Sequence, residues 1–237
     1  MKIKTVLYKS NDRGSTKLDW LDSKHSFSFG EYYNSGCTHF GALRVLNDDI
    51  VEPGKGFGTH PHNNMEIISI VLEGALEHKD NMGSIQVIKK DDVQVMSAGK
   101  GILHSEYNHS NEKKVNFLQL WIFPDKKNIE PRYDQKSFPL NERLDQLKVV
   151  ADGNQGSDAL TISQDAKVIL GNLSENKSID YSIKKNSGIY VFVIDGSLKI
   201  SDNLLEMKDT LSIEDIDTIN FSVKQMANFL IIEVPKN

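Results

Sequence analysis

Short apolar runs separated by turn residues are the feature that most constrains the fold of this chain. The runs alternate apolar with polar residues or are rich in β-branched residues, and in the first half they cover 27–29, 40–45, 67–72, 75–78, 84–88, 93–96 and 115–123. Glu73-Gly74 between two of these runs is a hairpin signal. The best helical candidate is short, at 141–147. Many short strands joined by turns predict an all-β sandwich or barrel.

The second half of the chain repeats part of the first half. The segment 71–76 resembles 193–198, and 90–95 resembles 208–213, in the same order and at similar offsets. We interpret this similarity as a duplicated β-domain. The segment 124–140 is rich in Pro, Lys, Asp and Asn without a sustained period, which predicts a linker. The predicted division is therefore an N-terminal domain at 1–130 and a C-terminal domain at 131–237.

Two short histidine-rich segments, Gly-Thr-His60-Pro-His62 and Gly-Ile-Leu-His104-Ser-Glu106, carry the strongest functional signal. In an extended strand, alternate residues point to the same face. His60 and His62 therefore share a face, and so do His104 and Glu106. If the two strands face one another, three imidazoles and one carboxylate converge. Such a set suits a divalent transition metal with open positions, as in non-haem Fe(II) oxygenases.

The distribution of histidines confines a metal site to the first half. All seven histidines lie within the first 109 residues, and structural roles are expected for the four outside the two segments, namely His25, His39, His78 and His109. Carrying the four ligand positions across the repeat leads to Ser182, Lys184, Ser222 and Lys224. These residue types make no transition-metal site, so the C-terminal domain is expected to lack one.

Composition excludes several classes of function. The net charge is -5 and the pI near 5.8, which gives no basic footprint for direct nucleic-acid binding. No apolar run approaches the roughly 20 residues of a membrane span. The segment 1–6 lacks the apolar core of a signal peptide. The single cysteine, Cys37, permits no internal disulfide and fits a reducing compartment, so a cytoplasmic protein is expected.

Two motifs resemble those of the cupin superfamily. The first runs over 54–74 as G-x5-HPH-x3-E followed by a glycine, with one extra residue before that glycine. The end of the second cupin motif matches 101–108. More narrowly, the chain resembles the pirin family in FSF-x2-Y at 27–32, in HPH at 60–62 and in SAGKGILHSE at 97–106. The motifs are specific in combination, since either histidine pair alone would be weak.

The resemblance implies a bicupin, with two β-sandwich or jelly-roll β-barrel domains packed face to face. It implies one metal in the N-terminal domain, bound by His60, His62, His104 and Glu106, and none in the C-terminal domain. Pirin-like proteins resemble flavonol (quercetin) 2,3-dioxygenases. Some members in higher organisms act as iron-dependent transcriptional coregulators in the nucleus.

The expected reaction follows from the chemistry of a flavonol, whose 3-hydroxyl lies beside a 4-carbonyl and can bind a metal through oxygen. Loss of the hydroxyl proton gives an electron-rich enolate that reacts with dioxygen, and ring cleavage releases carbon monoxide and a depside. A nearby base is required. Glu106 is the first candidate for this base and Glu66 the second. Fe(II) is the first candidate for the metal, and Zn, Mn, Ni, Co and Cu accept the same ligands.

Two other functions remain open at this point. One is a metal-binding regulatory or protein-interaction protein of pirin type without turnover, which would require a partner protein. The other is a different cupin activity, such as an isomerase or another dioxygenase. Fold resemblance does not separate these functions. Substrate turnover distinguishes a flavonol dioxygenase from a regulatory protein without turnover. Product identity distinguishes it from an enzyme with a different cupin activity.

Overall fold

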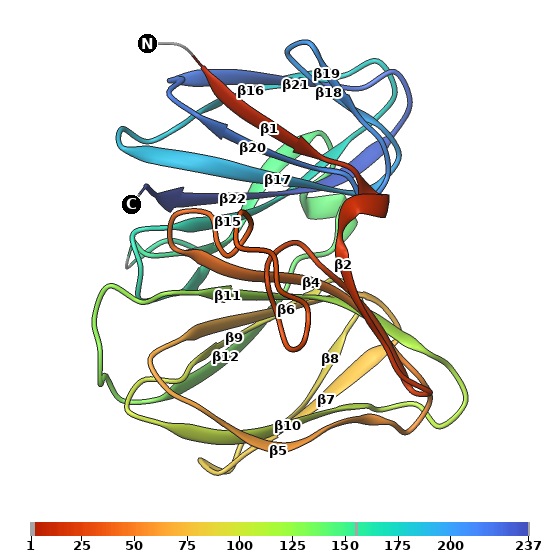
Figure 1. Ribbon diagram of the computed structural model, residues 1–237, viewed down its shortest axis with the longest axis vertical. Coiled ribbons are helices and arrows are strands. Elements are labelled where there is room, and N and C mark those ends of the chain that lie inside the picture. Colours follow the sequence, from red (N-terminus) through yellow and green to blue (C-terminus); the bar gives the residue numbers. More distant parts are fainter. Residues whose placement is uncertain (1–2, 155, 237) are drawn as a thin grey trace.

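The computed structural model describes residues 3–154 and 156–236, which form two stacked β-domains (Figure 1). Each domain pairs a seven-stranded sheet with a four-stranded sheet. The large N-terminal sheet runs, in spatial order, β12 (Arg132–Ser137), β9 (Asp92–Ser97), β6 (Glu66–Glu73), β11 (Val115–Ile122), β4 (Leu43–Val51), β3 (Leu21–His25) and β2 (Gly14–Lys17). The small N-terminal sheet runs β5 (Gly56–His62), β10 (Ile102–Asn108), β7 (Ala75–Asp80) and β8 (Ile85–Lys89).

The C-terminal domain has the same plan. Its large sheet runs β1 (Lys4–Tyr8), β20 (Thr210–Glu214), β17 (Ser187–Asp195), β22 (Ala227–Pro235), β15 (Lys167–Leu173), β13 (Gln146–Asp152) and β14 (Leu160–Thr161). Its small sheet runs β16 (Ser178–Ser182), β21 (Thr218–Ser222), β18 (Leu198–Ile200) and β19 (Asn203–Leu205). The prediction of an all-β fold is confirmed. The helix expected at 141–147 is wrong, since that region holds only the end of a 3-10 turn, η2 (Leu140–Glu142), and the start of β13.

The sheet orders support the interpretation of a duplicated domain. Four central strands have equivalent positions in the two large sheets. The N-terminal order β9-β6-β11-β4 corresponds to the C-terminal order β20-β17-β22-β15. The repeated hairpins also share a turn, because Gly74 has φ +79° and Gly196 φ +81°. At either position a Cβ would come within 3 Å of a backbone carbonyl oxygen, that of Lys114 or Met226 respectively. Glycine is needed at both turns for the same steric reason.

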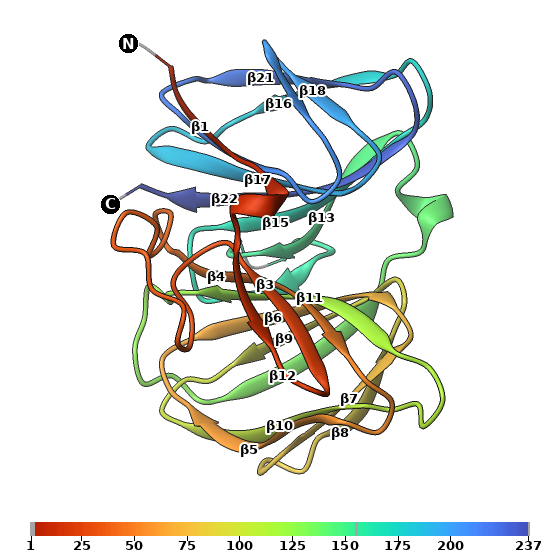
Figure 2. The same ribbon diagram turned by 45° about the vertical axis from the view of Figure 1, so that its right-hand side comes forward.

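The predicted boundary between the domains needs correction. Within the expected linker, Arg132–Ser137 forms β12, which pairs with β9 and completes the edge of the N-terminal sheet. At the corresponding edge of the C-terminal sheet, β1 from the start of the chain pairs with β20 (Figure 2). No residue of β12 is fully buried, so its sequence shows no hydrophobic period and resembles a linker. The sheets therefore do not divide at 130/131.

The two large sheets face each other and share one hydrophobic core. Side chains from both contribute to it, including Leu118 and Ile68 from one sheet and Phe192 and Leu230 from the other. The small sheets lie at the two outer ends of the molecule (Figure 1). Burial of this continuous apolar layer accounts for the face-to-face arrangement of the domains.

The interior of the N-terminal domain is polar at its centre. Two small hydrophobic clusters lie apart from each other there, one around Phe117 and one around Met96. Between them a row of polar residues crosses the large sheet in direct register, running through His25, Asn47, Gln119, Ser69 and Gln94. All five are buried. Because buried polar groups need partners, this row marks where a functional site lies.

The same space in the C-terminal domain is filled by apolar side chains. Strands β16 and β21 direct Ile179, Tyr181, Ile219 and Phe221 toward the hydrophobic core of that domain. The C-terminal positions that the repeat matched to the metal ligands therefore lie one residue away from the inward-facing positions. Ser182, for example, is exposed. Such an interior offers few ligand atoms to a metal, and the expectation of no metal site there stays a prediction.

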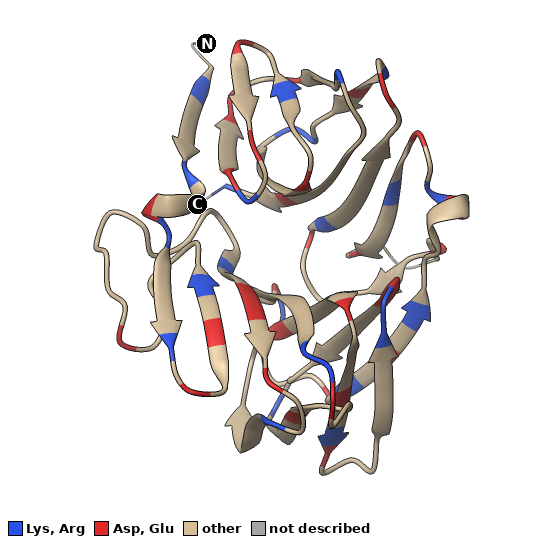
Figure 3. Ribbon diagram, turned by 90° about the vertical axis from the view of Figure 1, so that its right-hand side faces the viewer, with Lys and Arg blue, Asp and Glu red and all other residues tan. Residues whose placement is uncertain are grey.

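Lysines and arginines are interspersed with acidic residues over both domains (Figure 3). In the part of the chain that the structure describes, no helix combines the length and apolar character needed to cross a membrane.

Candidate metal centre

The two histidine segments lie on neighbouring antiparallel strands of the small N-terminal sheet. In the register of β5 and β10, His60 stands opposite His104, and His62 stands opposite Ile102. Alternation along each strand turns the three imidazoles toward the inside of the domain. Their ligand nitrogens all lie within 4.8 Å of one another. The structure thus brings together the three histidines that the sequence indicated.

The histidine geometry fits one metal ion. The Nε2 atoms of His60 and His104 are 3.0 Å apart. Two nitrogens bound at right angles to one ion at about 2.1 Å would be about 3.0 Å apart. His60 also donates from Nδ1 to the carbonyl oxygen of Gly58 at 2.7 Å, which leaves its Nε2 lone pair free. The donor set and its spacing therefore fit a divalent transition metal.

Burial keeps two of these imidazoles neutral. It lowers the pKa of His62 to about 4, with a further contribution from His60. It also lowers the pKa of His104 to about 2, helped by the charges of His60, His62 and His78. A metal ligand must be unprotonated, so these shifts leave the lone pairs available at neutral pH.

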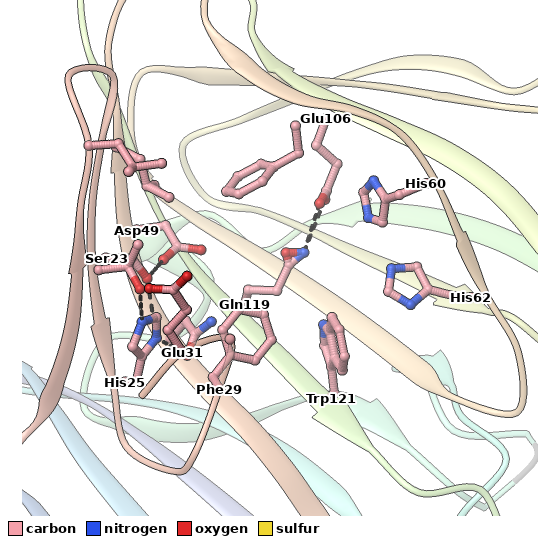
Figure 4. Close-up of a pocket in the computed structure, with 16 residues that line it drawn as sticks. Ser23, His25, Phe29, Glu31, Asp49, His60, His62, Glu106, Gln119 and Trp121 are labelled. Carbon is pink, nitrogen blue, oxygen red and sulfur yellow. Dashed lines mark hydrogen bonds between the residues drawn. The ribbon is translucent and has the colours of Figure 1, made fainter. Parts of the chain in front are cut away.

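Glu106 lies beside the histidines on β10 and is held by the polar row. Gln119 donates from Nε2 to its carboxylate at 2.9 Å (Figure 4), and Ser69 donates from Oγ at 3.2 Å. Burial, followed by the charge of Asp49, raises the pKa of Glu106 to about 8. Its carboxylate lies within 4.8 Å of ligand atoms of His104 and His78. Its role as the fourth ligand stays a prediction.

Glu66, the second candidate for the base, lies away from the metal-binding histidines and does not line the cavity beside them. Glu66 is buried on the other face of β6, where it accepts a hydrogen bond from Ser97 Oγ at 2.7 Å. Arg132 of β12 donates to the same Ser97 oxygen at 3.0 Å. The turn between β5 and β6 contains Asn64 with φ +48°. Because of this turn, the inward and outward positions of side chains along β5 do not continue in phase along β6. Sequence spacing across that turn therefore does not predict the face.

The structure adds His78, for which only a structural role was expected. His78 on β7 is fully buried, and its Nδ1 lies 3.4 Å from Nδ1 of His104. Its Nε2 lies 3.1 Å from Oδ2 of Asp80. Burial raises the pKa of Asp80, but hydrogen bonds from His78, Ser84 and Met82 outweigh it and the net pKa is lowered. The spacing of His78 and Asp80, two residues apart on one strand, was the available sequence signal.

This arrangement fixes which nitrogen of His104 carries a proton. The Asp80 carboxylate can only accept, so Nε2 of His78 is protonated and its Nδ1 is free to accept. His104 then donates from Nδ1 to His78 and presents its Nε2 lone pair beside His60. Such supporting hydrogen bonds hold a metal-binding imidazole in one orientation.

Replacing His78 by phenylalanine should lower metal affinity by about 10–100-fold, because the acceptor for His104 Nδ1 is lost. The aromatic ring would keep its packing against Tyr133, whose ring centroid is 4.6 Å away. Competition with a chelator of known affinity measures the change. His109→Phe is a matched control, since His109 is exposed and contacts Glu77 instead. Equal metal affinities of wild type and His78→Phe would show that His78 does not support His104 as a ligand.

Metal affinity should also depend on pH above neutrality. With a pKa of about 8, the Glu106 carboxyl group is mostly protonated at pH 7 in the metal-free protein. A metal that binds through this carboxylate displaces the proton, so affinity rises by about tenfold per pH unit up to pH 8 and levels off above it. Titrations between pH 7 and 9 measure the slope. Glu106→Gln should remove the pH dependence of metal affinity. The same slope in that variant would show that another group causes the pH dependence.

A cavity of about 470 Å³ opens beside the metal-binding histidines. This volume lies within the range of about 300–1,000 Å³ that small-molecule sites occupy. Figure 4 shows His60 and His62 on one side of the cavity, with the rings of Phe29 and Trp121 beside them, and Phe57 also lines it. His62 packs edge-on against Trp121, with ring centroids 4.8 Å apart. The cavity therefore suits a flat ligand that reaches the metal.

Comparison with known proteins assigns the family. Residues 8–122 match the family model described as Pirin, and residues 149–234 match that of the quercetinase C-terminal cupin domain. A protein named quercetin 2,3-dioxygenase from Escherichia coli (strain K12) is 38% identical over 229 residues, 97% of this chain and 98% of that protein. The chain belongs to the pirin family. A pirin-like protein from Caulobacter vibrioides is 36% identical over 221 residues, covering 93% and 95% of the two chains.

Solved structures confirm the predicted bicupin fold of this pirin. The crystal structure of YhhW from Escherichia coli has a TM-score of 0.95 at 35% identity and covers 99% of both chains. Bacterial pirin YhhW in complex with nickel(II) gives a TM-score of 0.94 at 35% identity, over 99% of this chain and 100% of that chain. Oxalate decarboxylase from Bacillus subtilis, at 9% identity and TM-score 0.69 over 97% and 76% of the chains, shares the fold alone.

Proposed function

We propose that this pirin is a metal-dependent dioxygenase that cleaves a flavonol such as quercetin in a 2,3-dioxygenase reaction. The observation that carries the proposal is the convergence of three imidazoles at one end of a cavity with aromatic walls. The quercetin 2,3-dioxygenase name of a relative that is 38% identical over 97% of the chain supports it. His60, His62, His104 and Glu106 would hold the metal, for which we propose Fe(II) first.

The bound metal would supply a Lewis acid for the flavonol oxygens and a route for electrons to dioxygen. The protein itself must take the proton of the 3-hydroxyl group, and Glu106 is the group in place to do so. Without a nearby cation its pKa is about 8, and a divalent ion beside it would lower that pKa and make it a carboxylate. Gln119 and Ser69 hold the carboxylate by donating to it.

The walls of the cavity position the substrate and exclude water. Phe29, Phe57 and Trp121 offer flat apolar surfaces to the fused rings of a flavonol. Desolvation in such a pocket strengthens the interaction between the enolate and the charged end of the cavity. The overall reaction adds both atoms of dioxygen to the flavonol and releases carbon monoxide and a depside.

Oxygen uptake by metal-loaded protein tests the proposal. Fe(II)-loaded protein should consume one dioxygen and release one carbon monoxide per quercetin cleaved, as measured with an oxygen electrode and gas analysis. Protein treated with a chelator is the control, and reloading should restore the rate. Metal-loaded protein that binds quercetin but neither consumes oxygen nor releases carbon monoxide would refute the dioxygenase. The regulatory function without turnover would then be preferred.

A further inference from the structure

A second polar cluster lies in the cavity across from the metal-binding histidines. Ser23 and His25 on β3 stand directly opposite Asp49 and Asn47 on β4 in the antiparallel register. All four side chains are buried. Figure 4 shows Ser23, His25 and Asp49 on one side of the cavity and His62 on the other. Neither the metal centre nor the proposed base uses these residues.

The cluster is held rigidly by its own hydrogen bonds. His25 donates from Nδ1 to Oδ1 of Asn47 at 2.9 Å, and the Thr16 hydroxyl lies 2.8 Å from its Nε2. Because the amide oxygen only accepts, Nδ1 of His25 is protonated and Thr16 donates to Nε2. Ser23 donates from Oγ to Oδ1 of Asp49. These bonds fix the ring and the carboxyl group before any ligand arrives.

Asp49 retains hydrogen-bonding capacity toward the cavity. Ser23 occupies one carboxyl oxygen, and the carboxyl group points into the cavity from this wall (Figure 4). Burial, with a contribution from Asp48, raises the pKa of Asp49 to about 7. Near neutral pH the group can therefore accept from or donate to a ligand hydroxyl. A buried carboxyl group in a dry cavity costs free energy unless it has such a partner.

The distribution of chemistry along the cavity defines the ligand class. The metal-binding histidines lie on one side and hydrogen-bonding groups on the other, and Phe29, Phe57 and Trp121 add aromatic surface to the lining. We propose that Asp49 and Ser23, beside the fixed ring of His25, form a subsite for hydroxyl groups of a polyhydroxylated aromatic substrate, on the substrate ring that lies farthest from the metal. This proposal rests on the proposed function, because that function places the reacting oxygens of the substrate at the metal and so sets its orientation.

The test compares quercetin with 3-hydroxyflavone, which keeps the metal-binding 3-hydroxyl and 4-carbonyl groups but lacks the other hydroxyls. Affinities are measured by fluorescence titration of Ni(II)-loaded protein without oxygen, so no turnover is required. Wild type should bind quercetin about tenfold more tightly than 3-hydroxyflavone, and both Asp49→Leu and Ser23→Ala should reduce this preference severalfold. Asp22→Leu is the control, since Asp22 lies outside the cavity between Lys17 and Lys24.

The outcomes separate the subsite from the reaction. A preference that depends on Asp49, in protein that consumes no oxygen, would support the subsite and refute the dioxygenase. Oxygen uptake with quercetin, together with an unchanged preference in Asp49→Leu and Ser23→Ala, would refute the subsite and keep the dioxygenase. Equal affinities of wild type for the two flavonols would also refute the subsite. Circular dichroism and thermal melting show whether each variant is folded. If Asp49→Leu does not fold, the comparison is made with Ser23→Ala.

Discussion

Replacing His62 by alanine should abolish both metal binding and turnover while leaving the protein folded. His62 contributes one of three imidazoles whose ligand nitrogens lie within 4.8 Å of one another. Loss of a supporting residue around a metal site costs about 10–100-fold in affinity, and loss of a ligand should cost more. The side chain is only half-buried at the end of β5, so the midpoint of thermal unfolding without metal should change little.

Metal content per chain after dialysis, measured by elemental analysis, checks this result. Wild type should hold one metal ion and His62→Ala close to none. His109→Ala is the matched control, because this exposed histidine contacts Glu77 away from the cavity and should keep the full metal content. A wild-type content near two would point to a further site in the C-terminal domain. Full metal content in His62→Ala would refute the ligand assignment.

The second large effect distinguishes the two carboxylates that the sequence offered. Glu106→Gln should lower metal affinity by more than about 100-fold and remove oxygen consumption, since a glutamine keeps the size but neither the charge nor the basicity. Glu66→Gln should keep the metal, because Glu66 is hydrogen-bonded to Ser97 and to the backbone of Ser163 in the C-terminal domain. Its effect should be confined to stability, at about 1–2 kcal/mol for an altered buried hydrogen bond.

Each variant serves as the control for the other, because both replace a buried glutamate on a strand of the same domain. Chelator competition gives the affinities, and urea unfolding gives the free energies of unfolding. Loss of the metal in Glu66→Gln with retention in Glu106→Gln would reverse the assignment. Loss in both would show that the site depends on the packing between the domains.

Much of the metal centre could be predicted because its residues obey a local rule. His60 and His62 share a strand, as do His104 and Glu106, and alternation along an extended backbone is the same wherever the strand lies. The strand runs at 67–72, 93–96 and 115–123 could be predicted for a similar reason, since each buries several apolar side chains. The absence of period in β12 shows the limit, because edge strands bury too little to leave a pattern.

The errors arose wherever two segments had to be placed relative to each other. Glu66 was the second candidate for the base because it follows His62 by four residues, but the turn at Asn64 places it on the other face of the sheet. His78 was given only a structural role, although Asp80 two residues later was an available signal, because its neighbour His104 lies on a different strand. In the structure, β7 pairs with β10, and His78 stands opposite Glu106.

The sequence by itself determined the strand content, the duplicated plan and the identity of the three converging histidines, because these depend on residue type and on a period of two within single strands. Only the tertiary structure decided that β1 and β12 complete the large sheets, that His78 supports His104, and that Asp49 lies across the cavity from the metal-binding histidines. Those relations are set by pairing and packing between strands far apart in sequence. The free energy of such contacts comes from the assembled core, and local sequence patterns do not record it.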